Sequence, residues 1–413
     1  MKFWIVSVGE PLPIDGASTR LRRMGNLAQF SSKQNVEVEW FSVSFNHYKK
    51  TQRCKGDADF QINDKFILHI VDSVPYKRNV SVARIRHHKQ AGKSIYTRMK
   101  ACEKPDVIIA SMEPLEVSKA AVVYAREHNI PCIVDVRDLW PEIYYDVIPR
   151  QLHWVLNFYV KSCAKTLNYT MSNCDSIVGL SNGFLNYGLK YAKREKTAND
   201  AVYPIAYPNN DYSVYKDKLQ EYWGGYGIKE TDFLVIFLGN FGDQFEFDEI
   251  IEASKHFESV QNIKFVLCGN GKHEEEIKKA VGSNVVVPGW IEKEQIFSLM
   301  ANASMGIAPY INSMNYRLNT PNKFGEYLSA GLPIAVSVPG EMEALLSQHE
   351  CGSAYRNTKE LIELIEKYYY NDELLSLHSS NARALYESLF NAENSNQKFL
   401  NHIINISKSK KER

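Results

Sequence analysis

The stretch "TPNKFGEYLSAGLPIAVS", residues 320–337, predicts a short helix followed by a buried strand. Thr320 is a suitable N-cap, Pro321 suits the first turn, and Gly331 is expected to end the helix. The apolar run 332–338 is typical of a strand inside a parallel sheet. The stretch therefore predicts one helix-to-strand step of a β-α-β fold.

Lys323 is unusual because it places a cation in the first turn, where the free amides and the helix dipole are already positive. In one interpretation its side chain points into water and pairs with Glu326, one turn later on the same face. In the other, an anion lies at this helix start and is held by the amides and by Lys323. Glu326 would then accept hydrogen bonds from hydroxyl groups of the same ligand. A phosphate beside a diol indicates a nucleotide.

Length and composition indicate a folded protein of two domains, with 413 residues, 44% hydrophobic and 23% charged. The net charge of +1 gives no general argument for a nucleic-acid partner, and none is expected. Seven scattered cysteines without a C-x-x-C pair indicate neither disulfides nor a zinc site. We also expect no metal and no cofactor. No apolar run is long enough to span a membrane. We expect a cytoplasmic protein, or one bound peripherally at the inner face of the cytoplasmic membrane.

Two series of alternating strands and helices predict two doubly wound α/β domains. The first series has strands expected at 2–9, 36–44, 106–111, 131–136 and 174–181. The second has strands expected at 232–240, 263–272, 284–290 and 305–310. The proline-containing segment 201–217 is expected to connect the domains. Ligands of such sheets bind beyond the carboxyl ends of the strands, and we expect both edges to face a central cleft.

The second half contains, in order, "GNFG", "LCGNGK", "VVPGW", "GIAPY" and "PNKFGEYLSAGLPI", and the first half contains "RDLWPE". This order, with a Gly- and Arg-containing loop after the first strand, resembles bacterial GT-B glycosyltransferases of the GT4 type. Within that family it is most similar to the branch of L-fucosamine transferases of surface polysaccharide synthesis, such as O-antigen and capsule.

The resemblance implies a GT-B fold of two Rossmann-like domains, with the acceptor bound by residues 1–207 and the nucleotide sugar by residues 208–385. Residues 386–413 would form a C-terminal helix that crosses back to the first domain, and a basic tail. The implied activity is retaining transfer of a hexosyl or N-acetylhexosaminyl group. The donor would be a UDP-linked sugar, and the acceptor lipid-linked or a glycan.

Many members of this family carry an E-x7-E pair whose second glutamate lies on the helix at the start of the stretch 320–337. Glu326 matches the second glutamate, which the resemblance assigns to the ribose hydroxyls, but Leu318 stands in place of the first. The branch with "P-x-K-x-x-E-Y" generally lacks the first glutamate too, so we interpret Leu318 as a trait of that branch. Two alternatives remain open: a nucleotide-sugar 2-epimerase of the same fold, and a non-catalytic partner subunit that binds a nucleotide sugar.

Without a metal, fixed donors and cations must stabilise the diphosphate leaving group. In the second domain, Lys323 and Arg317 are the cations expected to bind the diphosphate. The alternative for Arg317 is an exposed loop residue without a role in binding. Trp290 would line the base pocket or pack in the core. The remaining candidates for donor binding are the backbone positions Asn322, Asn240, Gly242, Gly269 and, in the first domain, Gly16.

Asp138 follows a predicted strand and is the candidate base for the acceptor, or an electrostatic partner of the oxocarbenium-like centre. Arg137 would orient Asp138 or bind phosphate, unless the two form a buried pair that closes the domain. Glu142 is a weaker catalytic candidate. Arg20 and Arg23 face either an anionic acceptor or solvent.

Residues 76–100 contain eight Lys or Arg and no acid, which indicates contact with an anionic membrane or a lipid-pyrophosphate acceptor. The aromatic run 152–163 either joins that surface or faces the core. "DAD" at 57–59 is interpreted as a solvated turn and not as a metal site. The basic tail 407–413 is expected to be a solvated terminus.

Overall fold

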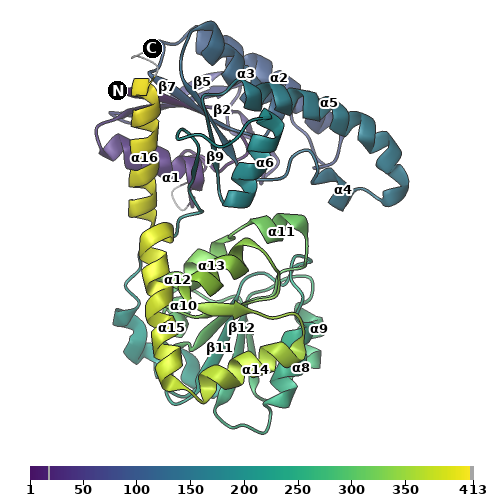
Figure 1. Cartoon of the computed structure of the whole chain (residues 1–413), viewed down its shortest axis with the longest axis vertical. Helices are drawn as coiled ribbons and strands as arrows, with labels where there is room; N and C mark the ends of the chain where they lie inside the picture. The colour runs from purple at the N-terminus through teal and green to yellow at the C-terminus, as the bar shows by residue number, and fades with distance from the viewer. Residues whose placement is uncertain (17–18, 410–413) are drawn as a thin grey trace. The chain divides into compact units, whose positions relative to one another are not determined.

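The computed structural model describes residues 1–16 and 19–409, and the chain divides into two compact units (Figure 1). Unit 1 contains Met1–Pro204 and the C-terminal segment from Ser395, and unit 2 contains Ile205–Asn394. We expected domain boundaries after residues 207 and 385, whereas the units divide after residues 204 and 394. Residues 410–413 of the basic tail lie outside the described residues.

Unit 1 is built on an eight-stranded sheet in the order β10-β9-β8-β7-β1-β2-β6-β5. Its strands are β1 Lys2–Val6, β2 Glu37–Val43, β5 Ala58–Asn63, β6 Phe66–Val71, β7 Val107–Ser111, β8 Cys132–Val136, β9 Ser176–Gly179 and β10 Ala201–Val202. Neighbouring strands pair in parallel, except that β5 is antiparallel to β6. A short hairpin joins β3 Phe45–Asn46 to β4 Thr51–Gln52. The strand order reverses between β1 and β7, which makes that edge the switch point of this sheet.

The helices of unit 1 are α1 Arg23–Lys33, α2 Val82–Lys100, α3 Leu115–Glu127, α4 Tyr144–Val147, α5 His153–Ser172 and α6 Asn182–Ala192, with a 3-10 turn η1 at Arg150–Leu152. The last helix, α16 Ala392–Ser409, begins in unit 2 and continues beside α1 in unit 1 (Figure 1). Four apolar residues of α16 share a hydrophobic cluster with α1 and the sheet, namely Phe399, Leu400, Ile403 and Ile406. Their helical spacing explains why the C-terminal helix packs on this core.

Unit 2 is built on a six-stranded parallel sheet in the order β13-β12-β11-β14-β15-β16. Its strands are β11 Phe233–Leu238, β12 Ile263–Cys268, β13 Val285–Gly289, β14 Met305–Ala308, β15 Ile334–Val336 and β16 Gly352–Ala354. The α-helices are α7 Leu219–Trp223, α8 Asp248–His256, α9 Glu274–Ala280, α10 Lys293–Asn302, α11 Met314–Leu318, α12 Asn322–Ser329, α13 Glu341–His349, α14 Thr358–Tyr369 and α15 Asp372–Leu385. Shorter turns are η2 Ser213–Lys218, η3 Gly224–Tyr226 and the π-helical η4 Tyr386–Phe390. Here the order reverses between β11 and β14.

The fold-class prediction of two doubly wound, Rossmann-like domains is confirmed, and each strand expected in the two series contains an observed strand. The prediction that Thr320 caps α12 is wrong, because Pro321 occupies the N-cap and the buried Thr320 hydroxyl has no hydrogen-bond partner. Gly331 ends the helical segment as expected, in a left-handed conformation with φ 71°.

The interpretation of residues 57–59 as a solvated turn is also wrong. Ala58 begins β5, and the Asp59 carboxylate pairs with His69 and Arg98. Segment 201–217 is more ordered than a linker, since it contains β10 and η2, although the boundary between the units lies inside it.

Candidate functional site

Helix α12 is fixed across the switch point of unit 2 by one buried tyrosine. The Tyr327 hydroxyl accepts a hydrogen bond from the Leu238 amide at the end of β11, at 2.9 Å. The Tyr327 ring lies against the backbone of Gly306 in β14, where a Cβ would approach the ring to 2.6 Å. The start of α12 therefore lies beside the carboxyl ends of β11 and β14, where sheets of this kind bind ligands.

Lys323, in the first turn of α12, extends its ammonium group over two aromatic rings of this edge. Its Nζ lies 4.8 Å from the centroid of the Phe237 ring and 5.3 Å from that of Phe245. The position is available because residue 239 is glycine: a Cβ on Gly239 would lie 1.9 Å from Nζ. Cation-π contact thus replaces hydration around much of this ammonium group.

The Lys323 ammonium has no hydrogen-bond acceptor and no ion-pair partner within residues 1–16 and 19–409. Burial lowers the pKa of Lys323 to about 8, although the charge of Glu326 acts in the opposite direction. The interpretation in which Lys323 points into water and pairs with Glu326 is therefore wrong. A partly buried, unpaired cation at the amino end of a helix is a ready site for an anion.

Glu326 lies one turn further along α12 and is partly exposed. Its Oε1 accepts a hydrogen bond from the Tyr207 hydroxyl at 2.8 Å, which holds the carboxylate in one orientation. Its Oε2 accepts no hydrogen bond from the part of the chain that the structure describes. That oxygen remains available to hydroxyl donors of a ligand.

Helix α11 and its connection to α12 carry three further polar atoms without a partner among the described residues. They are Asn315 Oδ1, Asn319 Oδ1 and Thr320 Oγ1, each buried and without a hydrogen bond to any described residue. Buried polar atoms are nearly always paired in folded proteins, so their concentration within six residues is uncommon. Lys323 suits an anion, whereas the two asparagine oxygens can accept hydrogen bonds only from donors, such as hydroxyl groups of a polar ligand.

The other donor-site candidates of unit 2 lie around this edge. Arg317 is exposed at the end of α11, and its Nε donates to Asn312 Oδ1 at 2.7 Å. Asn322 is exposed as the first residue of α12. In the loop after β11, Asn240 Oδ1 accepts from Gln244 Nε2 at 2.7 Å, across the partly exposed Gly242.

Two candidates from the neighbouring strands have different surroundings. Trp290 follows β13 and is 73% exposed, so the alternative of a packed core tryptophan is wrong. Gly269 follows β12 with φ 143°, and a Cβ there would lie 1.7 Å from the Gly239 carbonyl oxygen. Gly269 is therefore needed for packing of two strand ends against each other, which accounts for the glycine without a ligand.

A second polar cluster lies at the switch point of unit 1. Glu10 follows β1, Glu113 follows β7, and Asp135 lies in β8. Arg23 binds Asp135 through two hydrogen bonds of 2.9 Å and donates to the Tyr203 carbonyl at 2.7 Å. The prediction that Arg23 faces an anionic acceptor or solvent is therefore wrong.

Arg137 lies among three carboxylates of the same cluster. It forms an ion pair with Glu10, and its Nε lies 3.9 Å from both Glu113 and Asp135. The neighbouring carboxylates raise the pKa of Arg137 despite its burial. Arg137 pairs with Glu10 and not with Asp138, so the predicted Arg-Asp pair that closes the domain is not formed.

Asp138 is the member of this cluster with an available carboxylate. Its backbone amide donates to Glu113 Oε1 at 3.1 Å, whereas its side chain accepts no hydrogen bond from a described residue. Burial raises the pKa of Asp138, and burial together with the Asp138 charge raises the pKa of Glu113. A carboxylate with a raised pKa and no partner is suited to accept a proton.

Sequence reasoning missed Glu10, Glu113 and Asp135. A signal was present for the first two, because the dipeptide Glu-Pro follows β1 at 10–11 and β7 at 113–114. Glu142, by contrast, accepts hydrogen bonds from the Tyr187 and Tyr191 hydroxyls. Both oxygens of its carboxylate accept from tyrosines of α6, so Glu142 lacks the available oxygen of Asp138, and its catalytic role stays a prediction.

The remaining two candidates lie in the loop after β1. Gly16 and Arg20 are both exposed, and Gly16 has a left-handed φ of 136°. Elsewhere in unit 1, Glu39, His69 and Cys102 offer metal-ligand atoms within 4.8 Å of one another. Lys2 lies 3.1 Å from Glu39, so that carboxylate is already neutralised by a protein cation.

Residues 232–371 match the family model described as "Glycosyl transferases group 1". No curated protein matches the chain. Among solved structures, sucrose-phosphate synthase from Thermosynechococcus elongatus aligns with a TM-score of 0.67 and 12% identity over 97% of both chains. WaaG, a glycosyltransferase involved in lipopolysaccharide biosynthesis, aligns with a TM-score of 0.62 and 15% identity over 98% of this chain and 99% of that one.

Anabaena HepE in complex with UDP aligns with a TM-score of 0.62 and 13% identity, over 97% of this chain and 98% of that one. No described helix is long and apolar enough to cross a membrane. The chain has the GT-B fold, and residues 232–371 of its unit 2 are similar to the glycosyl transferases group 1 model.

Proposed function

We propose that this protein is a retaining glycosyltransferase that moves a sugar from a UDP-linked donor to a lipid-linked or glycan acceptor. The observation that carries the proposal is the unpaired Lys323 ammonium at the amino end of α12. It lies inside the segment that matches the glycosyl transferases group 1 model. The complexes of Anabaena HepE with UDP and with UDP-glucose support a uridine nucleotide.

In the proposed donor complex, the diphosphate lies against the first turn of α12. Lys323 and the free amides of that turn neutralise its charge, and Glu326 Oε2 accepts hydrogen bonds from the ribose hydroxyls. Trp290, exposed after β13, provides a surface for the base. As the glycosidic bond breaks, negative charge grows on the diphosphate, and a cation held in a water-poor site stabilises that charge most. Arg317 and the amides of the 240–242 loop are secondary donors.

In the proposed acceptor site, the Asp138 carboxylate takes the proton of the attacking hydroxyl group. Its raised pKa makes it a better base than an exposed aspartate, and the Glu113 carboxyl next to it limits the negative charge of the pair. Arg137 is held by Glu10 and serves as a fixed positive charge beside this pair. Arg20 and the backbone of Gly16 remain candidates for contacts to the acceptor and to the donor phosphate.

The acceptor class, the retaining outcome and the role in surface polysaccharide synthesis belong to the same proposal. They are supported by the resemblance of the "PNKFGEYLSAGLPI" motif to the L-fucosamine transferase-like branch. A lipid-linked acceptor further implies work at the inner face of the cytoplasmic membrane, as a peripheral protein.

The first test is a thermal-shift screen of the protein against UDP, GDP, ADP and CMP, followed by transfer assays with UDP-sugars and a lipid-linked acceptor panel. We expect UDP alone to stabilise the protein strongly, and the product to keep the anomeric configuration of the donor by NMR. Lys323→Met and Glu326→Gln should lose UDP affinity. Conversion of a donor without any acceptor would instead identify an epimerase, and UDP binding without any turnover a binding subunit.

A further inference from the structure

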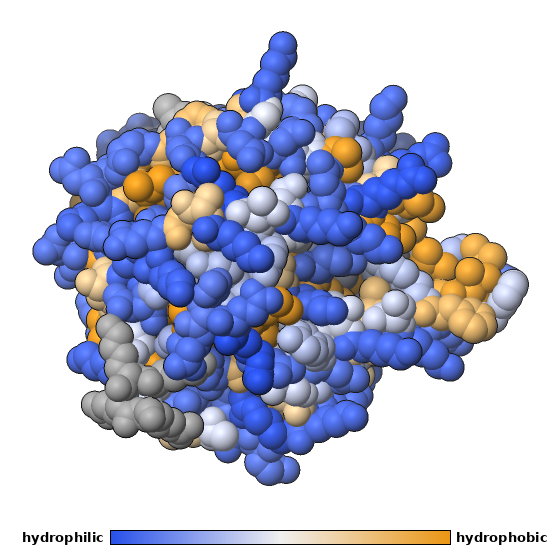
Figure 2. Space-filling view, turned by 90° about the horizontal axis from the view of Figure 1, so that it is seen from above, coloured by the Kyte–Doolittle hydropathy of each residue, from blue (hydrophilic) through white to orange (hydrophobic). Residues whose placement is uncertain are grey.

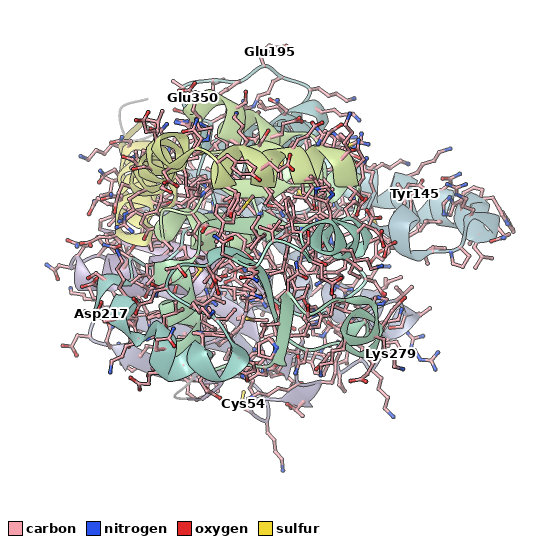
Figure 3. All side chains as sticks on the ribbon, turned by 90° about the horizontal axis from the view of Figure 1, so that it is seen from below. Cys54, Tyr145, Glu195, Asp217, Lys279 and Glu350 are labelled. Carbon is pink, nitrogen blue, oxygen red and sulfur yellow. The ribbon has the colours of Figure 1, made fainter. Side chains whose placement is uncertain are left out.

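Unit 1 exposes an apolar surface at the start of α5, formed by Leu152, Trp154, Val155 and Phe158 and called here the α5 tip. Trp154 is 68% exposed and Phe158 72% exposed. Figure 2 shows hydrophobic residues gathered on a projecting part of unit 1, and Figure 3 places Tyr145 on the same projection. Large aromatic side chains that are exposed together indicate an interaction surface.

Hydrogen bonds connect the α5 tip to the segments next to it. The Tyr145 hydroxyl donates to Asn157 Oδ1 at 2.6 Å, which ties α4 to α5. His153 Nε2 is bonded to the Ile148 carbonyl at 2.9 Å. On the inner side of the helix, Leu156 is buried. The helix that carries the outward side chains is therefore anchored, and these side chains are exposed and not part of the core.

Along α5 itself the charged side chains all have one sign. Residues 147–174 contain Arg150, Lys161 and Lys165 but no Asp or Glu. Lys161 and Lys165 are exposed, and their spacing of three and seven residues from Phe158 places them on its face of the helix. At a rise of about 1.5 Å per residue, they lie roughly 4.5 and 10 Å from the level of Phe158 along the axis. An apolar end followed by lysines at this depth is the profile of a segment that enters the boundary of a bilayer.

A basic helix belongs to the same layer of unit 1. Helix α2 packs against α3, and α3 packs against α5 (Figure 1). The segment of α2 and its preceding loop, residues 76–100, carries eight Lys or Arg and no acid. Of these cations, Arg98 is paired with Asp59, whereas Arg86, Lys89 and Lys93 are exposed. The layer therefore presents positive charge that anionic lipids would neutralise.

We propose that the α5 tip docks the protein on a membrane that contains anionic lipids. Trp154 and Phe158 enter the apolar boundary, and Lys161 and Lys165 contact the lipid phosphates. This proposal rests on the proposed function for one point, namely that the lipid-linked acceptor lies in the membrane to which the α5 tip binds. A symmetric contact between two copies is disfavoured, because it would bring the same lysines against each other.

The test measures binding of the full chain to vesicles of phosphatidylcholine, with and without one third phosphatidylglycerol, by flotation in the absence of donor and acceptor. Wild type should float with the anionic vesicles. Trp154→Ser/Phe158→Ser and Lys161→Glu/Lys165→Glu should each lower the bound fraction at least tenfold. Tyr370→Ser is the matched control, since Tyr370 is 77% exposed in unit 2, and it should bind as wild type does.

Two further measurements keep the result interpretable. Each variant must retain the wild-type circular dichroism spectrum and melting temperature, which shows that loss of flotation is not loss of folding. Brominated lipids should quench part of the wild-type tryptophan fluorescence, and Trp154→Phe should remove that quenching while flotation persists. Unchanged flotation of Trp154→Ser/Phe158→Ser would overturn the proposal. The proposal would also fail if wild type were a dimer in solution and this double variant were a monomer. Because flotation needs no sugar transfer, its failure leaves the proposed transferase activity to be judged by its own assay.

Discussion

Replacing Lys323 with methionine should stabilise unit 2 and weaken UDP binding at the same time. The Lys323 pKa, lowered from 10.5 to about 8, corresponds to roughly 3 kcal/mol by which burial of the charge destabilises the fold at neutral pH. Methionine has a similar length and no charge, so this cost disappears. Loss of cation-π contact with Phe237 and Phe245 removes about 1–2 kcal/mol, part of which sulfur-aromatic contact returns. The expected net gain is about 1–3 kcal/mol.

The sign of the pH dependence follows from the same pKa. Below pH 8 both folded and unfolded chains carry the charge, and the full cost is present. Between pH 8 and 10.5 the folded chain loses the proton first, so wild-type stability should rise relative to Lys323→Met. The advantage of the variant should therefore be largest at neutral pH and should vanish near pH 10.5.

The assay is hydrogen exchange by mass spectrometry across a urea series, read on peptides of unit 2 so that unfolding of unit 1 does not enter. Calorimetry with UDP should show a loss of affinity of roughly 10- to 100-fold, the value of one charge-assisted hydrogen bond. Lys293→Met is the matched control, because Lys293 also lies over a ring, 5.0 Å from the centroid of Phe297, but is exposed. It should change neither quantity. A Lys323→Met protein with lower stability in unit 2, or with unchanged UDP affinity, would refute the reasoning.

Three other predictions test the two sites. UDP should bind wild type about tenfold more weakly at pH 9 than at pH 7 by calorimetry, because Lys323 loses its charge near pH 8, whereas Lys323→Met should show a flat profile. Asp138→Asn should lower kcat by roughly 100-fold or more with the UDP affinity unchanged, and loss of UDP binding would instead mean a structural role. Arg23→Met should destabilise unit 1 by about 3–5 kcal/mol in urea unfolding, because it leaves the buried Asp135 carboxylate without its bidentate partner; a change below 1 kcal/mol would contradict that role.

The local features of the fold could be predicted from the sequence because they depend on neighbours along the chain. Alternation of apolar strands and amphipathic helices indicated two doubly wound domains, and both sheets have that order. The same applies to α12: a helix with Lys323 in its first turn and Glu326 one turn later follows from a few consecutive residues. The strand ends near Asp138 and Trp290 were also identified locally.

What surrounds those residues was decided by the tertiary structure. Lys323 has an unpaired charge because Gly239 and two phenylalanines, more than seventy residues earlier, form its surroundings. Glu10, Glu113 and Asp135 meet because their strands are neighbours or near neighbours in the sheet, although they are far apart in the chain. Periodicity states which face of an element is buried, but it contains no information about the side chains packed opposite. The pKa of Lys323, the pairing of Arg23 and the available carboxylate of Asp138 all depend on those opposite side chains, and so only the folded structure determines them.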